Sequence, residues 1–228
     1  MGWRMSETTD PARRIALVTG ASRGLGRATA RALGARGWQV IALARTVGGL
    51  EELDDAIRAE GGPPATLVPA DITDSPALAR LGLAIHQRWG RLDLLVHCAA
   101  HAPLMSPLPH VPDQEFDRTM AVNATATERL IVMADPLLRA APQGCAAFID
   151  DPLSGKFLGS YAASKAAARA LVEAWSAENA RTGPRVVLHR PRPMRTALRA
   201  RFYPGEDPAG LASPADEAEA LLAALAID

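Results

Sequence analysis

A tyrosine and a lysine stand four residues apart, at Tyr161 and Lys165, in an alanine-rich stretch of the 228-residue chain. Residues at this spacing share one face of a helix. A lysine ammonium beside a phenol favours the phenolate and lowers the tyrosine pKa, which brings a weak acid closer to the operating pH for proton transfer. The pair predicts acid–base chemistry in which Tyr161 exchanges a proton with a substrate oxygen. Because many exposed helices carry such a pair, the prediction depends on a second motif upstream.

The second motif is a glycine-rich loop between an apolar run at 15–18 and a helical pattern that begins at 27. Glycines here permit a tight turn and let the backbone approach a pyrophosphate, which the positive end of the following helix attracts. Placement between a strand and a helix favours a dinucleotide site over the alternative, a plain glycine-rich turn. The loop residues expected to bind the dinucleotide are Gly20, Ser22, Arg23, Gly24, Leu25 and Gly26.

The end of the second apolar run indicates which dinucleotide binds. An Asp or Glu there would hold the adenosine ribose hydroxyls, but Ala44 takes that place and Arg45 follows it. Arg forms bidentate, charge-assisted bonds with phosphate, so Arg45 and Arg23 favour a 2′-phosphate. We therefore expect NADP(H), with NAD(H) as the second choice. The alternative for Arg45 is a solvated residue after a strand.

The elements that would position these residues alternate along the chain. Six apolar runs predict strands at 15–18, 38–44, 65–70, 92–96, 145–149 and 186–188. Helical patterns occupy 27–36, 50–59, 76–89, 114–138, 160–180 and 215–226. The strand runs lack period-two alternation, which is typical of strands covered on both faces. The pattern predicts an α/β fold with a doubly wound, Rossmann-type parallel sheet of about six strands and helices on both faces.

The domain organisation follows from composition. No break in composition divides the chain, so we expect a single domain over 13–228 after a disordered leader at 1–12. The segment 190–214 is rich in Pro, Gly and Arg and is interpreted as an irregular substrate lid. Its arginines either grip an anionic substrate or form a solvated loop, and we favour the solvated loop.

Taken together, the motifs resemble the short-chain dehydrogenase/reductase family over about residues 14–226. The most specific parts are the loop at 19–26 and the Tyr-Ala-Ala-Ser-Lys motif at 161–165. The resemblance implies that Asn123 keeps a water in place for proton relay and that Lys165 also holds the nicotinamide ribose. It assigns further cofactor contacts to Tyr161 itself and to Asp71, Ile72, Ala99, Pro191 and Thr196.

One departure from the family pattern lies in the catalytic set. The family has a serine after the fifth strand, where this chain has Asp151, and the loop to Tyr161 is shorter. An ionised Asp cannot donate a hydrogen bond to a substrate oxygen, and it raises the pKa of a neighbouring phenol. Three alternatives remain: Asp151 is protonated and donates, Ser154 takes the serine's place, or catalysis is impaired. A turn or capping role for Asp151 is a fourth.

Two other departures concern the frame of the site. His97, Cys98, Ala99 and Ala100 replace the family's Asn-Asn-Ala-Gly segment after the fourth strand. We expect His97 to be a core or loop histidine and expect no metal site, because no ligand spacing supports one. The family's closing strand is absent, which leaves about six strands. We expect a homodimer that pairs through the helices at 114–138 and 160–180.

Composition excludes several classes of function. Lys+Arg and Asp+Glu are equal at 25 each, so no long-range attraction to nucleic acid or an anionic membrane is expected. The apolar stretches are too short to span a bilayer, and no signal peptide is visible, so we expect a cytoplasmic protein.

The sequence therefore predicts an NADP(H)-dependent oxidoreductase that transfers hydride between the nicotinamide and a small carbonyl or secondary alcohol substrate, with Tyr161 as general acid and base. The alternative is an NADP-binding sensor or interaction protein with impaired catalysis, for which Asp151 is the main support.

Overall fold

The sheet has the architecture that the sequence predicts. The computed structural model describes residues 13–227, so the predicted leader at 1–12 lies outside the described residues. The strands are β1 (Ile15–Thr19), β2 (Gln39–Ala44), β3 (Thr66–Pro69), β4 (Leu94–His97), β5 (Cys145–Ile149) and β6 (Arg185–His189). They form one parallel sheet in the order β3-β2-β1-β4-β5-β6. The prediction of a six-stranded, doubly wound sheet is confirmed.

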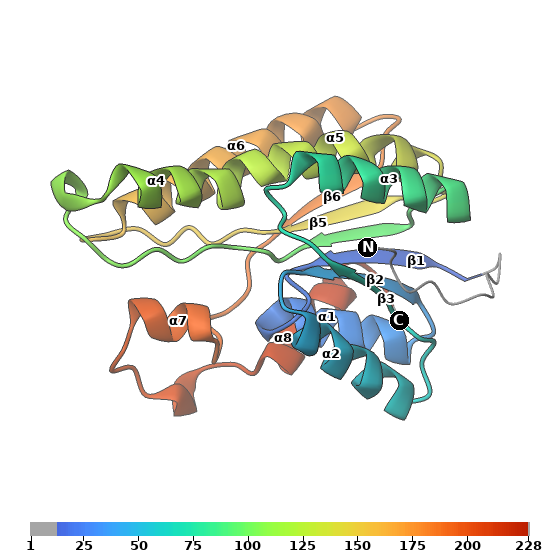
Figure 1. Cartoon of the computed structure of the whole chain (residues 1–228), viewed down its shortest axis with the longest axis horizontal. Helices are drawn as coiled ribbons and strands as arrows, with labels where there is room; N and C mark the ends of the chain where they lie inside the picture. The colour runs from blue at the N-terminus through green and yellow to red at the C-terminus, as the bar shows by residue number, and fades with distance from the viewer. Residues whose placement is uncertain (1–12, 228) are drawn as a thin grey trace.

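Helices cover both faces of this sheet (Figure 1). One layer holds α1 (Gly24–Ala35), α2 (Val47–Ala59) and α8 (Pro214–Ala224). The other holds α3 (Ser75–Trp89), α4 (Asp113–Met120), α5 (Ala126–Arg139) and α6 (Gly159–Asn179). Within the described residues, no helix is both long and apolar enough to cross a membrane.

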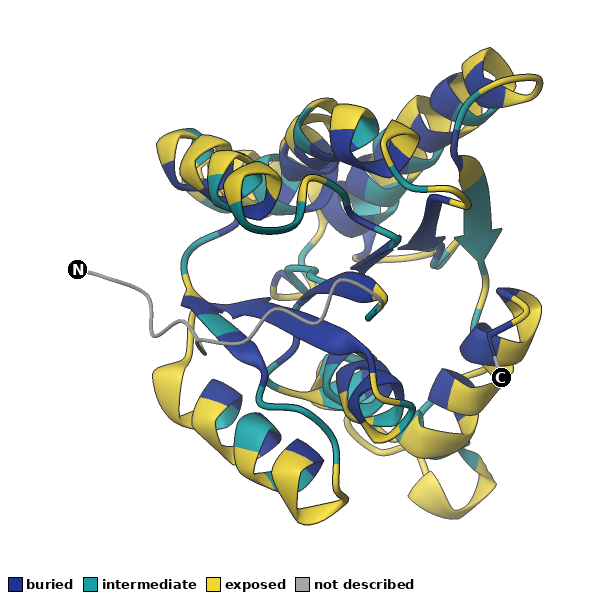
Figure 2. Cartoon of the chain, turned by 90° about the vertical axis from the view of Figure 1, so that its right-hand side faces the viewer, coloured by how far each residue is buried: buried dark blue, intermediate teal, exposed yellow. Residues whose placement is uncertain are grey.

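Successive residues of β1 explain the continuous apolar runs. Ala16 and Val18 join the core beneath α1, α2 and α8, whereas Ile15 and Leu17 join the core beneath α3, α5 and α6. Alternate side chains point to opposite faces of a strand, so a sheet covered on both faces needs apolar residues at every position. β1, β2 and β4 are accordingly buried along their whole length, whereas the edge strand β6 is only partly buried and the outer helix surfaces are exposed (Figure 2).

The strand order reverses between β1 and β4, which are neighbours in the sheet. Loops that leave the carboxyl ends of these two strands therefore meet at one edge, where ligands bind in open α/β sheets. The glycine-rich loop follows β1, and the segment with Ala99 follows β4. The fold thus brings two predicted cofactor-binding segments together.

The single helix predicted at 114–138 is interrupted. A π-helical turn, Ala121–Thr125, lies between α4 and α5 and contains Asn123. Such turns are rare and occur frequently at functional sites. The prediction of an uninterrupted helix was wrong because one extra residue in a turn leaves the apolar pattern almost unchanged.

The segment 190–214 is more regular than the sequence indicates. It contains α7 (Ala197–Phe202) and a 3₁₀ turn, Pro208–Gly210. Thr196 caps α7, because its Oγ1 accepts a hydrogen bond from the Arg199 N–H at 3.2 Å. Phe202 anchors the other end of α7 in a small apolar cluster around Tyr161. The expectation of a wholly irregular segment is therefore corrected.

Candidate active site

The glycine-rich loop is packed too closely for a side chain at Gly20 or at Gly26. Gly20 has φ +69°, and a Cβ there would lie 2.8 Å from the Ala99 nitrogen. A Cβ on Gly26 would lie 2.4 Å from the Gly20 oxygen. Gly24 also takes a positive φ, +58°, which favours glycine.

The N-terminus of α1 offers donors to an anion. Arg23 is its N-cap residue, and no side chain among the described residues caps the helix there. The first N–H groups of a helix lack partners within the helix and attract negative charge. This loop therefore fits the pyrophosphate of a dinucleotide, with Gly20, Gly24 and Gly26 giving the close backbone approach that such a group needs.

The predicted ribose end of the site is basic and open to solvent. Arg45 follows β2 with 57% of its side chain exposed, and its guanidinium lies 3.9 Å from an Asp71 carboxylate oxygen. The other Asp71 oxygen accepts hydrogen bonds from the backbone N–H and hydroxyl of Thr73 at 2.9 and 2.8 Å. Ile72 is buried beside them. The fold thus gathers Arg45, Asp71 and Ile72 at one end of the loop.

Tyr161 is almost completely buried and bonded to the aspartate at the unusual position. Its side chain lies in the first turn of α6, and its Oη donates to Asp151 Oδ2 at 2.8 Å. Burial and the Asp151 carboxylate raise the pKa of the Tyr161 phenol well above its usual value. This direction is opposite to the lowering of the Tyr161 pKa that its spacing from Lys165 predicts.

Lys165 lies one turn further along α6 and turns its ammonium toward β5. Its Nζ donates to the Ile149 carbonyl oxygen at 2.7 Å. Burial lowers the pKa of Lys165, against the opposing influence of Asp151 and Asp150. The Lys165 ammonium therefore lies beside the end of β5, where Asp150 and Asp151 also influence it.

Asn123 joins the loop after β4 to α6. Its Nδ2 donates to the His101 carbonyl at 3.0 Å and to Ser164 Oγ at 2.9 Å, while its Oδ1 accepts from the His101 N–H at 2.7 Å. Ser164 stands between Tyr161 and Lys165 in the sequence, and no pattern in the sequence predicts its bond to Asn123. The π-helical turn thus places the Asn123 amide against the helix that carries Tyr161 and Lys165.

His97 forms a buried network that the sequence did not reveal. Its Nδ1 lies 2.7 Å from Thr19 Oγ1, and its Nε2 lies 3.2 Å from Thr127 Oγ1. Thr127 Oγ1 in turn donates to the Asn123 carbonyl at 2.9 Å. Burial and the nearby Lys165 ammonium lower the pKa of His97 to about 3. A neutral His97 with Nε2 as donor completes this chain of bonds from β1 to the π-helical turn.

The two aspartates after β5 have different surroundings. Asp150 is 3% exposed and forms ion pairs with Arg169 and Arg190, both at 2.9 Å. Asp151 is half-buried and bonds to Tyr161. Ser154, the proposed substitute for the family serine, is exposed. Asp150 therefore has a structural role between two arginines, whereas Asp151 faces Tyr161, the predicted catalytic group.

We expect Asp150→Asn to lower the free energy of unfolding by about 2 to 3 kcal/mol, because two charge-assisted contacts lose their anion. Asp151→Asn is the matched control and should cost less than about 1 kcal/mol, since the amide can still accept the Tyr161 hydrogen bond. Urea unfolding of both variants measures the difference. Equal losses of unfolding free energy in the two variants would show that Asp150 is no more important for stability than Asp151.

Most arginines of the segment 190–214 have intramolecular partners. Arg192 pairs with the buried Glu217 at 2.6 Å, and Arg199 pairs with Glu206 at 2.6 Å. Arg201 donates to the Pro103 carbonyl at 3.3 Å. These contacts favour a structural role for the arginine run over an anionic substrate handle.

The same segment covers the predicted catalytic tyrosine. The Phe202 ring lies 4.8 Å from the Tyr161 ring, centroid to centroid, and Tyr161 is only 1% exposed. Nearer its start the segment approaches the glycine-rich loop, because a Cβ on Gly24 would lie 3.6 Å from the Thr196 methyl. Thr196 therefore stands between the glycine-rich loop and α7.

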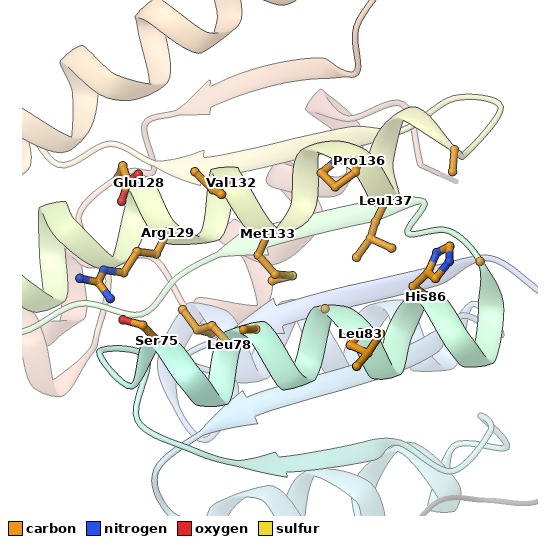
Figure 3. A pocket seen from close by; sticks show the side chains of 14 residues that line it. Ser75, Leu78, Leu83, His86, Glu128, Arg129, Val132, Met133, Pro136 and Leu137 are labelled. Carbon is orange, nitrogen blue, oxygen red and sulfur yellow. The ribbon is translucent and has the colours of Figure 1, made fainter.

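A surface pocket elsewhere on the molecule does not belong to this site. It lies between α3 and α5 and is lined mostly by apolar side chains, among them Leu78, Leu83, Val132 and Met133 (Figure 3). None of the predicted site residues lines it.

A doubly wound sheet with this loop and this tyrosine–lysine helix defines a dinucleotide-binding oxidoreductase. The model of the short chain dehydrogenase family matches residues 14–207. The chain is also similar to the uncharacterized oxidoreductase YciK of Escherichia coli (strain K12), with 32% identity over 208 residues, 89% of this chain and 82% of that protein. The protein therefore belongs to the short-chain dehydrogenase/reductase family, whose members act on CH–OH or carbonyl groups.

Two solved structures extend the similarity to the fold. A short chain dehydrogenase from Shigella flexneri 2a str. 301, complexed with NADP, has a TM-score of 0.82 and 30% identity over 89% of this chain and 87% of that chain. A short chain dehydrogenase from Escherichia coli CFT073, complexed with NADPH, has a TM-score of 0.82 and 31% identity over 89% of this chain and 86% of that chain.

Proposed function

We propose that the protein is an NADP(H)-dependent oxidoreductase that interconverts a carbonyl compound and a secondary alcohol, with Tyr161 as general acid and base. The observation that carries the proposal is the convergence of Tyr161, Lys165 and Asn123 on the sheet edge that holds the glycine-rich loop. The NADP and NADPH complexes of the similar structures support the choice of coenzyme. The loop, Arg45, Asp71, Ile72, Ala99, Pro191 and Thr196 would hold it.

The roles of the residues follow from their contacts. NADPH supplies the hydride when it is bound. Tyr161 holds the proton that the substrate oxygen needs, and Lys165 places a positive charge near the phenol when that proton leaves. Asn123 fixes the loop after β4 against α6 through its bonds to His101 and Ser164. The segment 190–214 would act as a lid that excludes water from the reacting groups.

NADPH oxidation with a panel of aliphatic and aromatic ketones and aldehydes tests the proposal. We expect NADPH to bind, its absorbance to fall with at least one carbonyl compound, and NADH to serve less well. If the protein binds neither coenzyme in calorimetry, the proposal is wrong.

We expect Arg45→Ala to weaken NADPH binding by about tenfold to a hundredfold, because a phosphate loses a charge-assisted contact. NADH binding should change less than about twofold, since NADH carries no 2′-phosphate. Fluorescence titration with both coenzymes gives the two affinities. An equal loss for both would place Arg45 elsewhere than at the phosphate.

A second candidate function is an NADP-dependent sensor with impaired catalysis. The bond between Tyr161 and Asp151 supports it, because the phenol proton is held by a carboxylate. A sensor would bind NADPH tightly without turnover of any carbonyl compound, and Tyr161→Phe would change nothing measurable.

We also propose a cytoplasmic homodimer that pairs through α5 and α6. Val132 on α5 and Leu171 on α6 are exposed apolar side chains on these helices. Sedimentation at micromolar concentration tests the dimer, and Val132→Lys should favour the monomer.

A further inference from the structure

Asp151 has no cationic partner in direct contact. Among the described residues it forms no ion pair, and its hydrogen bond comes from the neutral Tyr161 hydroxyl at 2.8 Å. The nearby cations have other partners: Lys165 donates to the Ile149 carbonyl, and Arg199 pairs with Glu206. Half-buried carboxylates normally have a cation or several donors, because desolvation of a charge is costly.

On the side of Tyr161, this carboxylate faces an apolar cluster. Tyr161 forms a small buried cluster with Leu158 and Phe202, and Leu153 and Leu198 pack against it. Leu153 comes two residues after Asp151, so the aspartate stands where the chain enters this cluster. A cation that reached Asp151 from the side of this cluster would be partly shielded from water, which strengthens the attraction.

The Tyr161 hydroxyl has one proton and two competing acceptors. In the structure it donates to Asp151. To protonate a substrate oxygen it must leave Asp151, which strands a carboxylate beside the negative charge that develops on that oxygen. With a neutral ketone, Asp151 loses its hydrogen bond and its carboxylate repels the developing negative charge on the substrate oxygen. A substrate that carries a cation avoids both costs, because the cation replaces the lost hydrogen bond of Asp151 and screens the two oxygens from each other.

We infer that Asp151 determines substrate specificity and that the substrate is an apolar, vicinal amino ketone or amino alcohol, whose ammonium pairs with Asp151 while Tyr161 serves the adjacent oxygen. The inference rests on the proposed function, since it assigns the substrate class of the same site. A nitrogen on the carbon next to the carbonyl lies within hydrogen-bond reach of a group that also contacts the carbonyl oxygen. The spacing of Asp151 and Tyr161 therefore matches a vicinal pair.

The reduction balances without a further reactant. The carbonyl carbon accepts the hydride that NADPH supplies, and the electron pair of the C=O π bond moves to the oxygen. Tyr161 gives its proton to that oxygen, and solvent later returns a proton to the phenol. The ammonium keeps its protons and its pairing with Asp151 throughout.

Phenacylamine and propiophenone test the inference, because they have nearly the same shape and differ by an ammonium in place of a methyl group. We expect kcat/KM for phenacylamine to exceed that for propiophenone by about tenfold to a hundredfold. Asp151→Asn should reduce this ratio to within about threefold of unity, because the amide keeps the shape and loses the charge. Asp55→Asn, the same change on the exposed face of α2, should leave the ratio unaltered.

Calorimetry provides a readout that does not depend on turnover. Phenylethanolamine should bind the protein, with and without NADP⁺, more tightly than ethyl phenyl carbinol, and Asp151→Asn should remove the difference. Equal affinities, or a preference that survives in Asp151→Asn, would overturn the inference. Turnover of propiophenone with no such preference would leave the proposed function standing and remove the inference alone. Absence of coenzyme binding would instead remove the proposed function, and the comparison without NADP⁺ would still decide the role of Asp151.

Discussion

Tyr161→Phe should lower kcat for NADPH-dependent carbonyl reduction by about two to four orders of magnitude, the usual contribution of a positioned general acid. The substitution removes one hydroxyl and keeps the ring that packs against Phe202 at 4.8 Å. NADPH binding should stay within about threefold of the original affinity, because the glycine-rich loop that is proposed to hold the coenzyme is unchanged. Steady-state rates at saturating carbonyl, together with a fluorescence titration of NADPH, measure the two effects separately.

Tyr203→Phe is the matched control for this experiment. Tyr203 is the other tyrosine of the chain. Its ring packs against the apolar cluster around Tyr161 and lies 3.9 Å from the Arg199 guanidinium, whereas the hydrogen bond to Asp151 comes from Tyr161. Its loss of a hydroxyl should change kcat by less than about threefold. If Tyr161→Phe kept full activity, the general acid would be another group and the proposed mechanism would be wrong.

The second large effect concerns acid stability. His97 has a folded-state pKa of about 3 against an ordinary value of 6.5. Between about pH 3 and pH 6.5, His97 therefore binds a proton in the unfolded chain and stays neutral in the folded chain. The stabilisation is complete above about pH 6.5 and falls by about 1.4 kcal/mol for each pH unit below it.

The variant His97→Asn isolates this contribution, since asparagine does not titrate. The difference in unfolding free energy between the original protein and the variant should shift by about 2 kcal/mol in favour of the variant between pH 7 and pH 5. Urea unfolding at both pH values gives the four free energies. Parallel pH profiles for the two proteins would show that His97 binds protons equally in the folded and unfolded chain, and the lowered pKa would be wrong.

The sheet could be predicted from the sequence because its determinants are local. Continuous apolar runs around Leu17, Ile41 and Leu95 require burial on both faces, and a parallel sheet satisfies this need. The predicted strand ends lie within a few residues of β1 to β6. The glycine-rich loop could also be predicted from the sequence. Its position between a strand and a helix indicates a tight turn, which requires glycine.

The site could be predicted only in part, because its electrostatics are non-local. The spacing of Tyr161 and Lys165 correctly puts both on α6, but the pKa of the phenol depends on burial by Phe202 and on contact with Asp151. The pairing of Asp150 with Arg169 and Arg190 joins three separate elements. No pattern within one segment shows which of two adjacent aspartates is paired with arginine.

The helix α7 and the His97 network show the same limit. Six residues of an arginine-rich segment give little helical signal, and α7 forms because Thr196 caps it and Phe202 is buried at its end. His97 binds threonines of β1 and of α5, thirty or more residues away. Such contacts appear only after the chain has folded.

The position of Phe202 over Tyr161 has a kinetic consequence. Tyr161 is 1% exposed and the Phe202 ring lies against it, so the proposed mechanism requires α7 to move before a substrate can reach the phenol. In that mechanism this opening precedes each catalytic cycle, and turnover cannot be faster than the motion. A solvent of higher viscosity would then slow the enzyme even if its chemistry were unaltered.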